Sequence, residues 1–356
     1  MEFSSDGVSW AAPEILDRLA KEAHREDALF DDDHATAELH RRVASVFGRD
    51  ADVFTVITGS AANGLALAAL TPPYGAVLAH WDAHVHTDEC GAPEMFTAGA
   101  KLLSLQGEHG KIEAEGLDEF LRSARFGVTH SSQPTVLSLT QATEAGTVYS
   151  VSELSALSKR AKSAGLRVHM DGARIANAIA ALDCTPADIT WKAGVDILCF
   201  GGTKNGAIAA DAVVVFDKSL SDTVRYMRKR SGHFVAKTRL FAAQLDAYLS
   251  DDLWLRHARQ ANAMAAKLAN GLARYANIQQ IHPVEANEVF VTLPDDLLRY
   301  LQNAGVRLYP NWRTTPLRHH RFVTSYYTTE KEINAVLALI EQWSSEASSS
   351  SESLRA

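Results

Sequence analysis

The sequence is poor in cysteine and has no long apolar run. Its three cysteines, Cys90, Cys184 and Cys199, lack the spacing of metal ligands, which argues against a disulfide framework or a structural zinc site. No stretch approaches the ~20 apolar residues of a membrane-spanning helix, and the N-terminus has no basic region followed by an apolar segment. We therefore expect a protein of the reducing cytoplasm with no membrane partner.

An excess of positive charge is also absent. The formal net charge is −8, and 22% of the residues are charged, so the sequence lacks the electrostatic footprint of a nucleic-acid-binding protein. The hydrophobic content of 46% over 356 residues is sufficient for a large core and favours two domains. A small-molecule partner is therefore expected.

What the sequence does contain, from about residue 50 to 217, is an alternation of short β-branched runs with longer amphipathic runs. This pattern is typical of βα units around a mostly parallel sheet, so the fold class is α/β. The clearest strands are 53–57, 135–139, 167–170, 196–200 and 212–216. Helical spacing follows over 220–276, and further strands at 289–292 and 321–324 indicate a second domain. Ligands of parallel sheets gather beyond the carboxyl ends of strands, where we expect a cofactor.

Three of these strand ends carry candidate chemistry. Gly59 and Ser60 open an Ala/Leu-rich helix after the first strand, where free N–H groups and the helix dipole favour an anion. Asp171 ends another strand and precedes Arg174, and Lys204 follows two glycines at a third. Taken singly, each has an ordinary alternative: a helix cap, a structural ion pair or a solvated lysine. Together they provide the anion pocket, carboxylate and amine that pyridoxal phosphate requires.

The ordered set of motifs resembles the L-threonine aldolase family, low-specificity type, among the fold type I, aspartate-aminotransferase-like enzymes. Its central block is His-Met-Asp-Gly-Ala-Arg at 169–174 and Phe-Gly-Gly-Thr-Lys-Asn-Gly at 200–206. Further matches lie at residues 5–6, 32–33, 59–63, 83–91 and 321–324. The resemblance implies a seven-stranded, mostly parallel sheet sandwiched by helices, a smaller C-terminal α/β domain, and pyridoxal phosphate as cofactor. The implied reaction cleaves L-threonine, L-allo-threonine and related substrates, with phenylserine as a candidate, to glycine and an aldehyde.

The resemblance also implies a role for each matching residue. Lys204 would form the Schiff base with the cofactor, Asp171 would keep its pyridine nitrogen protonated, and His84 would stack on the ring as the third catalytic residue. For His84 alone, an ordinary structural histidine is the alternative. The residues expected to bind the cofactor are Gly59, Ser60, Ala61, His84, Asp171, Arg174, Thr203, Lys204 and Lys237. Those expected to bind the substrate are Ser5, Arg174, Arg321 and Asp88, and no metal is expected.

Two segments depart from the family pattern. Residues 30–33 read Phe-Asp-Asp-Asp where the family usually shows Tyr-Gly-Asp-Asp, so a tyrosine hydroxyl is lost. Residues 141–144 read Gln-Ala-Thr-Glu where many members have Glu-Asn-Thr-His, so a second active-site histidine is missing. We therefore expect strict L-selectivity at Cα and low selectivity at Cβ. The roles of Glu144 and of His86, near His84, stay open.

The cofactor frame alone does not choose the reaction. A β-eliminating lyase, an aminotransferase and a non-catalytic regulatory domain that binds the cofactor are the alternatives. The resemblance implies a homotetramer built as a dimer of dimers, in which Lys237 could reach a neighbouring subunit's phosphate; a solvated helix face is the other interpretation. The expected organisation is an N-terminal arm (1–30), a large domain (31–245), a small domain (246–343) and a disordered serine-rich tail (344–356).

Overall fold

A computed structural model of the chain describes residues 1–309 and 319–353. Its central feature is a seven-stranded sheet of order β1-β7-β6-β5-β4-β2-β3. The strands are β1 Asp52–Val56, β2 Gly75–His80, β3 Lys101–Leu105, β4 Gln133–Thr140, β5 Arg167–Gly172, β6 Ile197–Gly201 and β7 Asp211–Val215. Strand β7 is antiparallel to both neighbours and the other pairs are parallel, which confirms the predicted α/β class. Strands β1, β4, β5 and β6 therefore end at the same edge.

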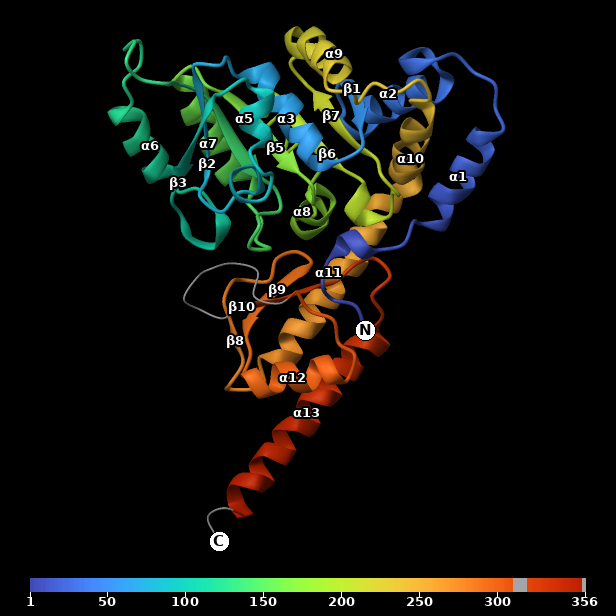
Figure 1. Cartoon of the computed structure of the whole chain (residues 1–356), viewed down its shortest axis with the longest axis vertical. Helices are drawn as coiled ribbons and strands as arrows, with labels where there is room; N and C mark the ends of the chain where they lie inside the picture. Colours follow the sequence, from blue (N-terminus) through green and yellow to red (C-terminus); the bar gives the residue numbers. More distant parts are fainter. Residues whose placement is uncertain (310–318, 354–356) are drawn as a thin grey trace.

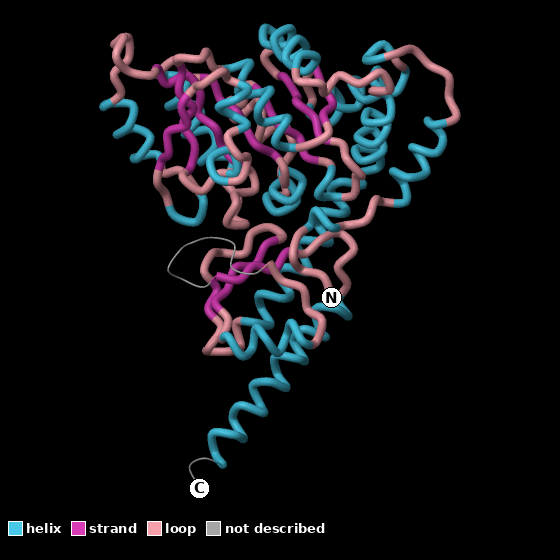
Figure 2. The backbone as a smooth tube through the Cα atoms, in the orientation of Figure 1, coloured by secondary structure: helices cyan, strands magenta, loops and turns pink. Residues whose placement is uncertain are grey.

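Helices cover both faces of this sheet, as Figures 1 and 2 show. Successive residues of β7 point to opposite faces of the sheet. Val213 and Val215 pack in the hydrophobic core on the face covered by α3 and α9, and Val214 packs in the core on the face covered by α2, α7, α8 and α10. Burial on both faces explains why these strands read as unbroken apolar runs. The helices are α1 Pro13–Ala23, α2 His34–Phe47, α3 Gly59–Leu70, α4 His84–Thr87, α5 Ala92–Phe96, α6 Ala114–Ser123, α7 Val151–Ser163, α8 Ile175–Leu182, α9 Ser221–Arg230 and α10 Arg239–Leu249.

A smaller antiparallel sheet, of order β10-β9-β8, lies beside the carboxyl edge of the large one (Figure 1). Its strands are β8 Gln279–Gln280, β9 Glu288–Thr292 and β10 His319–Val323, and its helices are α11 Leu253–Leu272, α12 Asp295–Asn303 and α13 Glu330–Ser353. Val289, Val291 and Phe322 join the core formed with these helices. Because side chains alternate along a strand, Glu288 and Arg321 occupy the other face of the sheet.

Short 3-10 helices complete the described chain. They are η1 Asp6–Val8, η2 Phe30–Asp32, η3 Glu108–Gly110, η4 Thr203–Asn205, η5 Lys218–Leu220 and η6 Ser250–Asp252. Two of them, η1 and η4, pack against each other near the end of β6. In the part of the chain that the structure describes, no helix is both long and apolar enough to span a membrane.

The two parts of the molecule share helix α11. Leu253 and Trp254, at its start, belong to the core on the large sheet, and Leu268 and Leu272, near its end, belong to the small core. The boundary predicted after residue 245 falls instead inside α10, whose buried side chains pack in the large core. The division into domains stays a prediction, and a boundary within α11 fits these two cores better.

Helix α13 extends away from the body of the molecule to the C-terminus (Figure 1). Its first turns are held by Ile333, Val336 and Ile340, which are buried in the small core. The helix continues as far as Ser353, whereas the composition favoured a disordered tail from residue 344. Extending a helix that tertiary contacts have already nucleated costs much less than starting one, which accounts for the difference.

Candidate active site

Six of the predicted site residues line one cavity of about 250 Å³ at the carboxyl edge of the large sheet. They are Gly59, Ser60, His84, Asp171, Thr203 and Lys204. Segments that are far apart in the sequence meet here because β1, β5 and β6 end at the same edge of the sheet. The cavity therefore lies where the strand pattern places a cofactor.

One end of the cavity is formed by the start of helix α3. The Thr58 hydroxyl caps the helix by accepting a hydrogen bond from the Ala61 N–H at 3.2 Å. Gly59 and Ser60 come first in the helix, so their N–H groups have no acceptor within it. A Cβ on Gly59 would meet no heavy atom within 4 Å, which leaves open space for a ligand. The N–H groups of Gly59 and Ser60 are thus available for the predicted anion site, and the N–H of Ala61 serves the cap.

The loop that carries Lys204 is fixed by a buried carboxylate that no sequence motif indicates. Asp211, at the start of β7, accepts hydrogen bonds from the Gly202 N–H at 2.8 Å and the Thr203 N–H at 3.1 Å. Burial raises the pKa of Asp211, and these hydrogen bonds and the charge of Lys204 oppose that rise. A Cβ on Gly201 would collide with the backbone of Ala173. Only glycine therefore lets the end of β6 approach the Ala173 backbone, just after β5, this closely.

Asp171 lies at the centre of a buried hydrogen-bond network. Its carboxylate accepts from the Asn63 side-chain amide at 2.9 Å and from the Ala173 N–H at 3.0 Å. The same Asn63 amide donates to Glu89 at 2.7 Å, and Glu89 lies 2.7 Å from Nδ1 of His84. Asn63 and Glu89 thus orient the two predicted catalytic groups. A buried asparagine in an apolar helix was the available signal for Asn63.

These contacts set the charges of the network. Burial raises the pKa of Asp171. The nearby His84, the hydrogen bond from Asn63 and His169 lower it by more than that, so the pKa of Asp171 lies below its ordinary value. Burial lowers the pKa of His84, but its hydrogen bond to Glu89 and the surrounding carboxylates outweigh this and raise it. Asp171 therefore carries a negative charge, as a partner of a protonated ring nitrogen must.

The residues fit pyridoxal phosphate. An anion site, an ionised carboxylate and a lysine surround one cavity, and the Asn63 side-chain oxygen is buried there without a hydrogen-bond partner. His84, Glu89 and Asp171 also offer three ligand atoms within 4.8 Å of one another, an arrangement that can hold a metal ion. A metal site would not need the Lys204 amine or the helix start at Gly59 and Ser60 in the same cavity, whereas pyridoxal phosphate needs both.

The predicted carboxylate-binding residues lie at the other end of the site and are already engaged. Arg174 binds Asp6 through two hydrogen bonds of 2.7 and 3.1 Å. Arg321 lies 3.1 Å from Glu288, which is also 3.4 Å from Arg174. The Ser5 hydroxyl accepts a hydrogen bond from the N–H of Gly7 at 3.0 Å, and Gly7 lines the cofactor cavity. Residues from the N-terminal arm, the large sheet and the small sheet therefore meet here.

A second cavity, of about 160 Å³, adjoins this end and is lined by both Glu144 and Arg321. Four histidines line it: His80, His109, His282 and His319. Residues 141–144 themselves contain no histidine. The structure brings imidazoles to Glu144 from β2, from η3 and from the small domain, and sequence spacing gave no sign of that convergence.

Several predicted residues lie outside both cavities. Asp88 is exposed at the end of α4 and accepts a hydrogen bond from the Thr87 hydroxyl at 2.8 Å, and its contact with the substrate stays a prediction. The adjacent Glu89 is buried instead. Helix α4 is a single turn, which is too short for the sequence pattern to show which of the two successive acids after it faces inward. Lys237 and His86 are also exposed and line neither cavity.

The departure at residues 30–33 has a structural role. Phe30 packs against Phe234 with ring centroids 4.7 Å apart, and Asp31 lies 2.7 Å from Arg228. Arg228 is almost fully buried and also donates to Thr55 at 3.0 Å. The acid that replaces the family's glycine thus neutralises a buried arginine.

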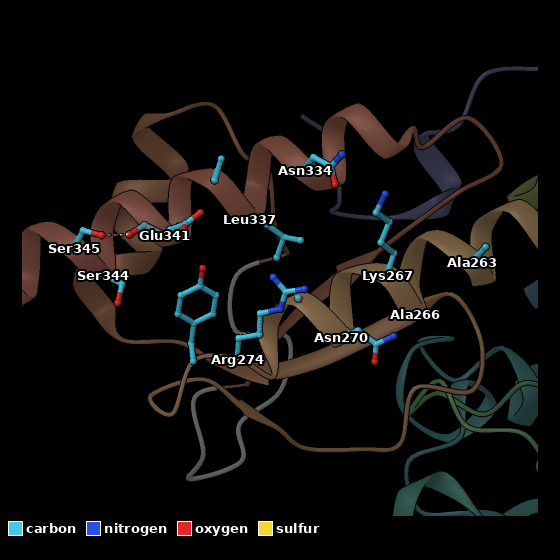
Figure 3. Close-up of a pocket in the computed structure, with 13 residues that line it drawn as sticks. Ala263, Ala266, Lys267, Asn270, Arg274, Asn334, Leu337, Glu341, Ser344 and Ser345 are labelled. Atoms are coloured by element: carbon cyan, nitrogen blue, oxygen red, sulfur yellow. Dashed lines mark hydrogen bonds between the residues drawn. The ribbon is translucent and has the colours of Figure 1, made fainter.

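A larger cavity, of about 1010 Å³, lies between α11 and α13 (Figure 3). Lys267, Arg274 and Glu341 are its charged lining residues, and Lys267 pairs with Glu330 at 2.8 Å. It is an open groove on the small domain, away from the strand ends of the large sheet that precede Gly59 and Lys204 (Figure 1). The smaller cavity at the sheet edge, which gathers those groups, is therefore the candidate active site.

Comparisons with known proteins agree with this geometry. The family model for beta-eliminating lyases matches residues 2–296. The chain is 40% identical over 337 residues to the low specificity L-threonine aldolase of a Pseudomonas species, covering 95% of this chain and 96% of that one. The chain belongs to this family and to its low-specificity L-threonine aldolases. The resemblance inferred from the motifs is thereby confirmed.

Three other comparisons extend this. The low specificity L-threonine aldolase of Pseudomonas aeruginosa is 42% identical over 308 residues, covering 86% of this chain and 88% of that one. The threonine aldolase of Leishmania major has a solved structure with a TM-score of 0.89 and 28% identity, covering 96% of this chain and 99% of that one. A cysteine desulfurase of Thermococcus onnurineus, at a TM-score of 0.73 and 14% identity, shares the fold.

Proposed function

We propose that this protein cleaves L-threonine, L-allo-threonine and related L-β-hydroxy-α-amino acids to glycine and an aldehyde, with pyridoxal phosphate as cofactor. The observation that carries the proposal is the convergence of Lys204, Asp171 and the Gly59-Ser60 helix start on one cavity. Membership of the low-specificity L-threonine aldolases supports the choice of reaction. When bound, pyridoxal phosphate supplies an electron sink for the electron pair released at Cα.

The chain's own residues divide the remaining work. Gly59 and Ser60 would hold the phosphate, Lys204 would attach the cofactor, and Asp171 would keep a proton on the ring nitrogen. His84, fixed through Nδ1 by Glu89, leaves Nε2 free to hold or move a proton at the substrate's β-hydroxyl oxygen.

The substrate carboxylate would bind between Arg174 and Arg321, whose planar guanidinium groups suit bidentate pairing. Both arginines are buried, and they come from different domains. Holding the carboxylate against one wall and the amino group beside Lys204 fixes the hand of Cα, so we expect only L-amino acids to be cleaved.

The test is product analysis with L-threonine, L-allo-threonine and phenylserine. Glycine together with acetaldehyde or benzaldehyde in equal amounts is the expected result. Ammonia with a 2-keto acid would indicate β-elimination, and a keto acid formed only with an amino acceptor would indicate transamination. No turnover of any substrate by cofactor-loaded protein would favour the non-catalytic alternative.

We further propose that the enzyme is a homotetramer, built as a dimer of dimers, in the cytoplasm. Lys237 supports the assembly, because this exposed cation lies outside the chain's own cavities and is free to meet a neighbouring subunit's phosphate. The three unpaired cysteines support a reducing compartment. Sedimentation at assay concentration should give a tetramer, and a fully active monomer would contradict the assembly.

A further inference from the structure

The carboxylate of Glu288 occupies the position between the two arginines. Its Oε1 lies 3.1 Å from Nη1 of Arg321 and 3.4 Å from Nη2 of Arg174. Glu288 and Arg321 are diagonal neighbours on the face of the small sheet opposite its core, since Glu288 is paired with Val323. Glu288 is fully buried, and its Oε2 has no hydrogen-bond partner. This side chain therefore makes the contacts that a substrate carboxylate would make.

Acids already outnumber the arginines around this position. In the part of the chain that the structure describes, four charged side chains face Glu288: Arg174 from the start of α8, Arg321 from β10, Asp6 from η1, and Glu144 from the loop after β4. Two arginines oppose Asp6 and Glu288 at contact distance. A substrate carboxylate would add a further negative charge to this buried cluster, which is costly unless another charge is removed.

We propose that Glu288 holds the substrate-carboxylate position in the free protein, and that substrate binding displaces it and leaves it protonated by one proton from solvent. The inference rests on the proposed function, because that function assigns the substrate carboxylate to Arg174 and Arg321. One negative charge then enters as one is neutralised, so the charge of the cluster is unchanged.

Glu288 is better suited to take the proton than Asp6. Asp6 accepts two hydrogen bonds from Arg174 and one of 3.0 Å from Asn287, and although burial raises its pKa, these partners lower it to about 2. Burial raises the pKa of Glu288, and the two arginines do not cancel that effect. Displacement from the arginines removes their lowering influence and raises the pKa of Glu288 further. Its unpartnered Oε2 can accept a proton without losing a hydrogen bond.

The sign of the pH dependence follows from this. Above the pKa of Glu288 in the free protein, binding requires proton uptake, so the Kd for a carboxylate should rise about tenfold per pH unit. Below that pKa, Glu288 is already protonated and the Kd should not depend on it. Glu288→Gln imitates the protonated form, so its Kd should stay flat across the same window.

The test uses cofactor-loaded enzyme and 3-hydroxybutyrate, which carries the carboxylate and hydroxyl of threonine but no amine to react at the cofactor. Calorimetric titration in two buffers of different ionisation enthalpy, repeated from about pH 5 to 9, counts the protons taken up. Wild type should take up nearly one proton per site at the alkaline end of the window, and Glu288→Gln none. The control Glu330→Gln, at an exposed ion pair of the same domain, should behave as wild type.

Three results would overturn the inference: binding to wild type without proton uptake at every pH, equal uptake by Glu288→Gln, or no binding of the probe. If Glu288→Gln does not fold, the wild-type proton count decides alone. Cleavage of L-threonine is measured on the same samples. Protein that cleaves threonine but fails the proton count refutes only the role of Glu288, whereas protein that neither cleaves threonine nor binds the probe refutes the proposed function as well.

Discussion

The two ends of the active site are built on different principles. At the cofactor end, Gly59, Asp171 and Lys204 follow three strands of one sheet, and hydrogen bonds hold them in place. At the substrate end, Arg174 and Arg321 come from different domains and are held by buried carboxylates. The rigid sheet thus fixes the chemistry, and carboxylate recognition depends on how the small domain meets the large one. Changes at the first end should impair turnover in a stable protein, and changes at the second should also impair stability.

The largest effect is expected at the cofactor end. Lys204→Ala removes the amine that attaches the cofactor, and we expect kcat/KM for L-threonine to fall about 10⁴-fold or more, roughly 5.4 kcal/mol or more. Thermal stability should change little, because the lysine lines a cavity. The control is Lys192→Ala, an exposed lysine on a surface ion pair, which should retain activity. Substantial cleavage by Lys204→Ala would remove this residue from the chemistry.

At the substrate end, Arg174→Ala should destabilise the fold. It leaves Asp6 and Glu288 buried beside one arginine instead of two, and breaking a buried ion pair on one side costs about 3–5 kcal/mol. Urea unfolding measures this directly. Arg225→Ala, which breaks an exposed pair with Asp222, should change the free energy of unfolding by at most about 1 kcal/mol. Equal effects of the two changes would show that the buried cluster contributes no special stability.

Returning to the cofactor end, Asp171→Ala should separate cofactor binding from turnover. The cofactor can still attach at Lys204, but without an ionised carboxylate the ring nitrogen loses its proton, and we expect kcat to fall about 10²-fold. Absorbance titration measures the cofactor and steady-state kinetics measure kcat. Asp118→Ala, at a partly exposed ion pair, is the control. An unchanged kcat in Asp171→Ala would show that another group protonates the ring.

The smallest effect concerns the β-carbon. No histidine occurs at residues 141–144, so we expect weak discrimination of the hydroxyl configuration. The ratio of kcat/KM for L-threonine and L-allo-threonine should stay below about 10²-fold, roughly 2.7 kcal/mol. His84→Asn should lower both values and alter their ratio little. A larger wild-type ratio would identify a dedicated hydroxyl partner, for which the histidines beside Glu144 are candidates.

Much of the fold could be predicted from local pattern. The apolar runs at 53–57 and 196–200 became β1 and β6 within one residue at each end, because burial on both faces leaves a plain signal. Strands β2 and β3 were not identified. The exposed lysine and serine and the partly exposed leucines of β3 give a weaker signal, because the side chains of this strand are not buried on both faces. The continuation of α13 through a serine-rich segment also could not be read from composition.

At the site, the sequence motifs indicated the side chains expected to contact the cofactor. They did not indicate the buried side chains that hold those groups in position. Lys204 and Asp171 follow glycines or a strand end and could be found by motif. Asp211 and Glu288 are single acids at the starts of ordinary strands, and only tertiary packing shows that they are buried against the lysine loop and the arginines. Pairing of this kind depends on the contact between domains, which local sequence does not encode.

The most direct test is borohydride reduction of the cofactor-loaded enzyme, followed by peptide mapping and a threonine-cleavage assay on the same sample. The account predicts that the cofactor becomes fixed to Lys204 alone, and that glycine formation from L-threonine is lost in proportion to the labelled fraction. Label on another lysine, or full cleavage by protein labelled completely at Lys204, would contradict it.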